Sequence, residues 1–89
     1  MIQAHIYYSG IVQGVGFRYT VEKIAVELNL RGWVKNLKDQ RVEALLQGER
    51  KVIEEFCQKL EFHFKDNIKE KIFEIQPLSG KFQDFKIVS

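Results

Sequence analysis

The chain has 89 residues, which is enough for one compact domain and too few for two. Its composition, 45% hydrophobic and 29% charged, is ordinary for a globular protein, and it contains no low-complexity tract. The 14 basic and 12 acidic residues are interspersed and give a net charge of +2. The sequence therefore lacks the basic stripe that is typical of nucleic-acid-binding proteins.

The chain carries no signal for a membrane or for secretion. Its apolar runs are far too short to span a bilayer, and residues 1–5 lack the regions of a signal peptide. A single cysteine, Cys57, cannot form an internal disulfide. We therefore expect one domain over residues 1–89, a cytoplasmic location, and no membrane or nucleic-acid partner. Nothing in the sequence requires a second copy, so a monomer is expected.

The most informative segment follows the first predicted strand. Apolar and polar residues alternate over residues 2–8, which predicts a strand. The sequence Gly-Ile-Val-Gln-Gly-Val-Gly-Phe-Arg occupies residues 10–18, and apolar positions then recur at helical spacing over residues 19–30. The order is therefore strand, glycine loop, arginine and helix start.

This order predicts an anion site that is best suited to phosphate. Gly14 and Gly16 allow the backbone to turn and present consecutive N–H groups, and the helix N-terminus adds unpaired donors. Arg18 contributes a planar cation that matches phosphate oxygens. The glycines alone would more often mark a turn, and neither the dinucleotide-binding nor the P-loop motif is completed.

The remaining pattern predicts an α+β fold. Its order is β-α-β-β-α-β with a short C-terminal strand, the ferredoxin-like split βαβ sandwich, in which a mixed sheet carries two helices on one face. After the first helix the predicted elements are a strand at 33–37, a turn at 38–40, a strand at 42–46, a helix at 52–60, a charged loop at 63–71, and strands at 72–78 and 82–88.

Read together, the loop and the hairpin make the chain similar to the acylphosphatase family over nearly its whole length. Residues 10–18 match the phosphate-loop signature of that family. The sequence Gly-Trp-Val-Lys-Asn-Leu at residues 32–37, with Val-Glu at 42–43, matches a second signature. A weaker third match lies between residues 79 and 87. Two separated signatures at family-like spacing make the resemblance specific.

The resemblance implies a small free-standing hydrolase that cleaves the carboxyl–phosphate bond of an acyl phosphate. The products are a carboxylate and inorganic phosphate, and neither a metal nor another cofactor is expected. By this resemblance Arg18 binds the phosphoryl group, and Asn36 positions a water for in-line attack. The remaining phosphate oxygens would be held by the backbone N–H groups of Gln13, Gly14, Val15, Gly16 and Phe17.

The chemistry fits these residues, and two departures from the family pattern lie outside the proposed site. A carboxylate is a good leaving group, so positioning and charge stabilisation can suffice. Gln40 replaces a glycine that many members have, and we expect strain in the hairpin turn. The charged segment 63–71 lacks the usual Pro/Gly-rich character, which leaves the substrate preference near it open.

Two alternatives remain at this stage. A ferredoxin-like sheet can bind RNA on its open face, where His5 and Tyr7 would form a thin aromatic platform. Acylphosphatase-like domains also occur in larger carbamoyl-transfer proteins, which would make carbamoyl phosphate the substrate. Such proteins carry zinc-binding cysteine pairs, whereas this chain has only Cys57.

Overall fold

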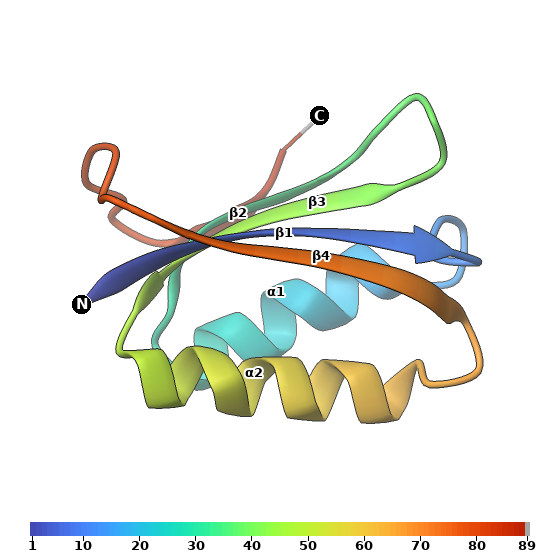
Figure 1. Cartoon of the computed structure of the whole chain (residues 1–89), viewed down its shortest axis with the longest axis horizontal. Helices are drawn as coiled ribbons and strands as arrows, with labels where there is room; N and C mark the ends of the chain where they lie inside the picture. The colour runs from blue at the N-terminus through green and yellow to red at the C-terminus, as the bar shows by residue number, and fades with distance from the viewer. Residues whose placement is uncertain (89) are drawn as a thin grey trace.

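Both helices lie on the same face of a five-stranded mixed sheet (Figure 1). The computed structural model describes residues 1–88. The elements, in chain order, are β1 (Ile2–Gly10), α1 (Phe17–Glu27), β2 (Arg31–Asn36), β3 (Val42–Gly48), α2 (Arg50–His63), β4 (Ile68–Gln76) and β5 (Phe85–Ile87).

The strand order β4-β1-β3-β2-β5 confirms the predicted ferredoxin-like arrangement with an added C-terminal strand. β1 pairs antiparallel with β3 and β4, and β3 pairs antiparallel with β2. β5 pairs parallel with β2. Because β3 lies between β1 and β2, these two strands run in the same direction. Their C-terminal ends therefore meet at one edge of the sheet.

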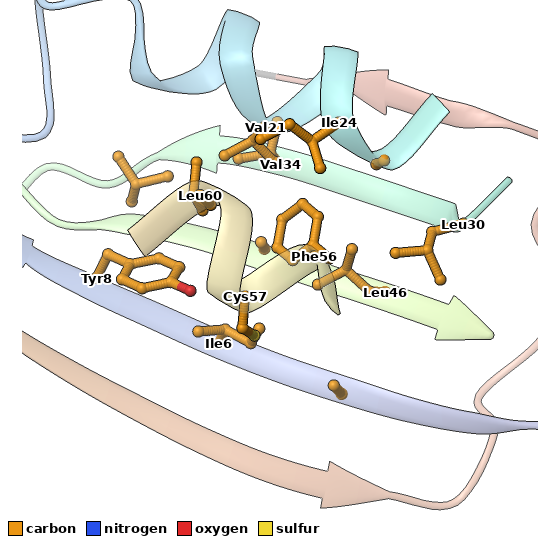
Figure 2. Packing of buried hydrophobic residues seen from close by; sticks show 14 of the residues in the cluster. Ile6, Tyr8, Val21, Ile24, Leu30, Val34, Leu46, Phe56, Cys57 and Leu60 are labelled. Atoms are coloured by element: carbon orange, nitrogen blue, oxygen red, sulfur yellow. The ribbon is translucent and has the colours of Figure 1, made fainter. Parts of the chain in front are cut away.

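The core lies between the sheet and the two helices (Figure 2). Along β1 the buried apolar side chains of Ala4, Ile6 and Tyr8 point to the helices, as the alternation predicts. Phe56 and Leu60 of α2 are fully buried against them. This burial fixes the register of β1, because a shift by one residue would expose its apolar face to solvent.

Most element boundaries differ from the sequence prediction by one to four residues, and α2 extends over Arg50–His63 instead of 52–60. α1 begins at Phe17, two residues earlier than expected, and ends at Glu27. The predicted loop at 63–71 is wrong over its last part, since β4 already begins at Ile68. β4 is an edge strand that is exposed along most of its length, so its charged residues stay in solvent and no alternation develops. The last strand is only Phe85–Ile87.

The connection from β4 to β5 crosses the face of the sheet that carries no helix. Ser79 donates its backbone N–H to Oε1 of Gln3 on β1, at 3.0 Å. Gln47 of β3 donates its side-chain amide to the carbonyl of Gly80, at 3.1 Å. Gln3 and Gln47 are buried under this connection although their pattern places them on the polar face. Ser79 and Gly80 thus contact this face of the sheet, and β5 begins only at Phe85.

Candidate functional site

The loop between β1 and α1 lies at the sheet edge where β1 and β2 both end (Figure 1). Its start is fixed to the residue before β4, because Ile11 donates its N–H to the Asn67 carbonyl at 2.9 Å. The Asn67 side-chain amide donates in return to the Ile11 carbonyl, at 3.1 Å. The loop therefore leaves the sheet from a defined position.

Two glycines give the loop the shape of an anion-binding concavity. Gly14 has a φ of 77° and Gly16 a φ of 79°, and Val15 between them does not share the positive φ. Alternation of left-handed and ordinary conformations turns successive N–H groups toward one side, which is the backbone arrangement called a nest. A Cβ at either glycine would meet nothing within 4 Å. The backbone conformation, not a lack of space, is what demands glycine here.

The N-terminus of α1 continues this donor array. Gly16 is the N-cap residue and offers no side-chain hydrogen bond, and the first turn contains no acidic residue. The first N–H groups of a helix have no partner within the helix, and the helix dipole makes this end positive. An anion in front of Gly16 would therefore meet both free donors and a favourable potential.

Arg18 lies in the first turn of α1, where a cation is unfavourable for the helix itself. Within residues 1–88 its guanidinium takes part in no ion pair and no side-chain hydrogen bond. It lines a cavity of about 180 Å³ together with Gly14 and Gly16. Arg18 is the only charged residue in the lining of this cavity. The cavity is therefore electropositive and suited to one small anion.

Asn36, the last residue of β2, lines the same cavity. The parallel directions of β1 and β2 explain this meeting, since both strands end at this edge. The Oδ1 atom of Asn36 is buried and accepts no hydrogen bond from residues 1–88. A buried acceptor without a donor is costly unless a bound group or water supplies one. Asn36 thus carries an acceptor without a donor and lines the cavity that Arg18 also lines.

Gln13 joins the loop to the hairpin that follows Asn36. Its side-chain amide donates to the Leu37 carbonyl at 2.8 Å and to the Arg41 carbonyl at 2.9 Å. These two carbonyls flank the β2–β3 turn, where Leu37 also donates its N–H to Arg41 at 2.8 Å. The sequence pattern suggests only a backbone role for Gln13. The structure adds a side-chain tie between the two parts of the site.

The structure brings together most of the residues that the sequence singles out. Arg18, Asn36, Gly14, Gly16 and Phe17 all line the cavity. Gln13 and Val15 belong to the same loop but are not among the lining residues. Sequence reasoning missed three further lining residues. Those missed are Val12, Tyr19 and Ile87.

Two of the missed residues had a local signal, and one of them, Val12, lies within the loop signature at residues 10–18. Tyr19 directly follows Arg18, so its proximity could have been inferred from the motif. Ile87 lies far away in the sequence and reaches the cavity because β5 pairs in parallel with β2, with Ile87 opposite Val34. No pattern near residue 87 announces that pairing.

On the open sheet face, the aromatic pair considered above as an RNA-binding platform is bonded to an acidic residue. His5 and Tyr7 do stack, with ring centroids 4.9 Å apart. Both also bond to one carboxylate of Glu43, at 2.5 Å from His5 Nε2 and 3.1 Å from the Tyr7 hydroxyl. Lys35 Nζ lies 3.8 Å from the same carboxylate and Arg41 lies over the Tyr7 ring, so both rings are engaged by side chains of the sheet itself.

Cys57 belongs to a buried group on the helix side. The Tyr8 hydroxyl donates to Oε2 of Glu61 at 2.8 Å, and Lys71 Nζ lies 2.6 Å from the same oxygen. Burial raises the pKa of the Cys57 thiol and, more strongly, that of the Tyr8 hydroxyl. Both groups therefore stay protonated at neutral pH, and the thiol has no nucleophilic character.

Two further features concern metals and membranes. Among residues 1–88, no three His, Cys, Asp or Glu side chains are grouped so that they could hold a metal ion. In the same part of the chain, no helix is both long enough and apolar enough to cross a membrane.

Comparisons with known proteins agree with this geometry. The family model described as "Acylphosphatase" matches residues 4–87. The acylphosphatase of Pyrobaculum islandicum is 37% identical over 89 residues, which cover 98% of this chain and 94% of that protein. The acylphosphatase of Trichormus variabilis is 51% identical over 55 residues, which span 62% of this chain and about half, 54%, of the relative.

A solved structure extends the similarity to the whole fold. The crystal structure of acylphosphatase from Bacillus subtilis superposes with a TM-score of 0.90 at 32% identity, and the match covers 100% of both chains. The sequence signatures, the fold and the lining of the cavity thus agree with one another. The chain belongs to the acylphosphatase family.

Proposed function

We propose that this chain is an enzyme that hydrolyses acyl phosphates to a carboxylate and inorganic phosphate. One observation carries the proposal: Asn36, whose buried Oδ1 accepts no hydrogen bond from residues 1–88, is among the residues that line the same small cavity as Arg18. Arg18 can hold an anion, and Asn36 can orient a water. Membership in the acylphosphatase family supports the same reaction.

The phosphoryl group would bind in the loop. The N–H groups of residues 13–17 and the guanidinium of Arg18 would hold its three non-bridging oxygens. These donors are fixed before the substrate arrives, so they need little reorganisation as charge redistributes in the transition state. The bond from phosphorus to the carboxyl oxygen would then point out of the loop, toward the mouth of the cavity.

Asn36 would place the attacking water opposite that bond. Its Oδ1 can accept a hydrogen bond from the water, which directs an oxygen lone pair at phosphorus. A neutral amide cannot deprotonate the water, so the attack proceeds with little prior proton loss. The new bond joins water oxygen to phosphorus, and the bond to the carboxyl oxygen breaks. The electron pair leaves with the carboxylate, and the water protons end on phosphate or in solvent.

The leaving group decides which phosphates this site can hydrolyse. A carboxylate departs without protonation, and positioning with charge stabilisation can supply the remaining acceleration. A phosphomonoester has a much poorer leaving group and would need a strong acid beside the bridging oxygen. No Asp, Glu, His or Cys is among the residues that line the cavity. We therefore expect acyl phosphates to be cleaved and phosphomonoesters to resist.

The test is phosphate release from benzoyl phosphate and acetyl phosphate, in the presence of excess EDTA. We expect turnover by the wild type and a roughly 10²–10³-fold loss in Arg18→Ala, the effect of removing one preorganised donor. Arg18→Lys should also be poor, because a point charge does not reproduce the planar fork. Arg50→Ala, which removes an exposed arginine paired with Glu54, is the matched control and should behave as wild type.

The Asn36→Ala variant distinguishes a role of Asn36 in positioning the water from a role in binding phosphate. Turnover should fall strongly while inorganic phosphate still inhibits the residual activity at similar concentrations, since the loop and Arg18 remain. A collapse of phosphate binding would make Asn36 a ligand instead of a water-positioning residue. Turnover of carbamoyl phosphate alone, with no activity on the other two substrates, would move the function to carbamoyl chemistry.

We also propose that the chain acts as a monomer in the cytoplasm. One chain already brings the cation of Arg18 and the amide of Asn36 into one cavity, so these two groups need no second copy to come together. A lone buried thiol, Cys57, suits a reducing compartment. Light scattering during size-exclusion chromatography should give a mass close to 10.5 kDa. Twice that mass at micromolar concentration would contradict the monomer.

A further inference from the structure

The mouth of the cavity is apolar, and this bears on the part of the substrate that the phosphate loop does not hold. Tyr19 and Ile87 line the cavity and are 69% and 37% exposed. Val12 and Phe17 line it too but are buried, so they belong to its floor. The exposed pair therefore stands where the acyl group of a bound substrate would emerge.

The size of the cavity requires that the acyl group lie at this mouth. A space of about 180 Å³ is smaller than the roughly 300–1,000 Å³ that holds a drug-sized ligand. The loop donors and Arg18 take up the phosphoryl end. An acyl group of any bulk must then rest on the rim, in contact with whatever side chains stand there.

The Tyr19 ring is free to make such a contact. Within residues 1–88 it stacks on no other aromatic ring, and its hydroxyl makes no hydrogen bond. Together with Ile87, it places two exposed apolar side chains at this one opening. Single exposed apolar residues are common, but a group of them beside a cavity is typical of ligand contact.

The charged residues that line the cavity limit which acyl groups it can accept. Arg18 is the only charged lining residue, and its guanidinium belongs to the phosphoryl end. The rim itself offers neither a cation for an acyl carboxylate nor an acid for an acyl amine. Resting on the proposed hydrolysis, we propose that Tyr19 and Ile87 form an acyl-binding rim that favours substrates with an aromatic or bulky apolar acyl group over small or charged ones.

The inference is tested by a ratio of specificities, because a ratio within one enzyme removes the different intrinsic reactivities of the substrates. We measure kcat/KM for benzoyl phosphate divided by kcat/KM for acetyl phosphate. Tyr19→Ser should lower this ratio about three- to tenfold, the size of an aromatic contact. Tyr19→Phe keeps the ring and should keep the ratio. Val26→Ser, an exposed apolar residue at the other end of α1, is the matched control.

Binding of stable analogues separates this inference from the proposed reaction. Phenacylphosphonate and acetonylphosphonate carry a CH₂ in place of the bridging oxygen and cannot be hydrolysed. Calorimetry should show tighter binding of the phenacyl compound, with the preference lost in Tyr19→Ser. If the wild type hydrolyses neither acyl phosphate but still binds the phenacyl compound more tightly, the proposed hydrolysis is refuted and the acyl-binding rim is supported. An unchanged ratio in Tyr19→Ser, or an equal loss for both substrates, would overturn the rim.

Discussion

The tie made by Gln13 links the stability of the fold to the geometry of the site. Its amide nitrogen donates to the carbonyls of Leu37 and Arg41, at 2.8 and 2.9 Å. Asn36 directly precedes Leu37, so these bonds hold the loop at a fixed position relative to Asn36, the residue proposed to position the water. Gln13→Leu removes both bonds and leaves a side chain of similar size.

The cost in stability follows from the partners that remain. Each hydrogen bond contributes about 0.5–1.5 kcal/mol, and a buried acceptor left without a donor adds to that. The Leu37 carbonyl keeps the Gln40 N–H at 3.3 Å, and the Arg41 carbonyl keeps the Leu37 N–H at 2.8 Å. Neither carbonyl is left without a donor, so we expect the free energy of unfolding to fall by about 1–2 kcal/mol.

The effect on turnover should exceed what stability alone explains. A displacement of about 1 Å in a catalytic group can cost roughly 10²-fold in rate. We therefore expect kcat of Gln13→Leu to fall about 10- to 100-fold at temperatures where the variant is fully folded. Inhibition by inorganic phosphate should change little, because Arg18 and the loop glycines are intact. The kcat of Gln13→Glu should fall further than that of Gln13→Leu, since a carboxylate cannot donate to the two carbonyl oxygens.

Urea denaturation gives the stability, and steady-state kinetics with acyl phosphates give kcat and KM. Gln58→Leu, the same change at an exposed position on α2, is the control and should leave both unchanged. Wild-type kcat in a Gln13→Leu variant that loses stability would show that the tie serves the fold alone. Wild-type values for both would refute the reasoning altogether.

Two further predictions concern stability. Gln40 has a φ of 78°, which confirms the strain expected in the hairpin turn. Gln40→Gly should therefore raise the free energy of unfolding, measured by urea denaturation, by about 0.5–1 kcal/mol. Gln83→Gly, at an exposed loop position, is the control and should give no such gain. Burial raises the pKa of the Cys57 thiol and the Tyr8 hydroxyl above their ordinary values of 9.0 and 10.0. Above about pH 9 the unfolded chain releases protons that the folded chain keeps, so stability should fall as pH rises. Cys57→Ala should flatten this slope between pH 9 and 10, and an unchanged slope would contradict the assignment.

The sequence by itself determined the order of the elements and the place of the glycine loop between β1 and α1. Alternation in β1 and helical spacing in α1 are local patterns, and each identifies an element without knowledge of its neighbours. The glycines at 14 and 16 and the arginine at 18 are likewise local, because one loop and one helix start hold them together. The existence of β1, the glycine loop and α1, which depends on short segments, therefore agrees with the structure.

Only the tertiary structure decided what is near that loop. Asn36 meets Arg18 because β1 and β2 run in the same direction on either side of β3 and end at one edge. Ile87 reaches the cavity through the parallel pairing of β5 with β2, and Gln13 finds its two carbonyls across the hairpin.

The exposed edge strand β4 is a second case in which the local sequence pattern does not reveal the tertiary structure. Its residues Lys69, Glu70 and Lys71 looked like a loop because charge alone suggested solvent. Local patterns report burial, whereas strand pairing is decided by backbone hydrogen bonds to a distant partner. An edge strand needs only that pairing and buries neither face, so its side chains carry no sign of it.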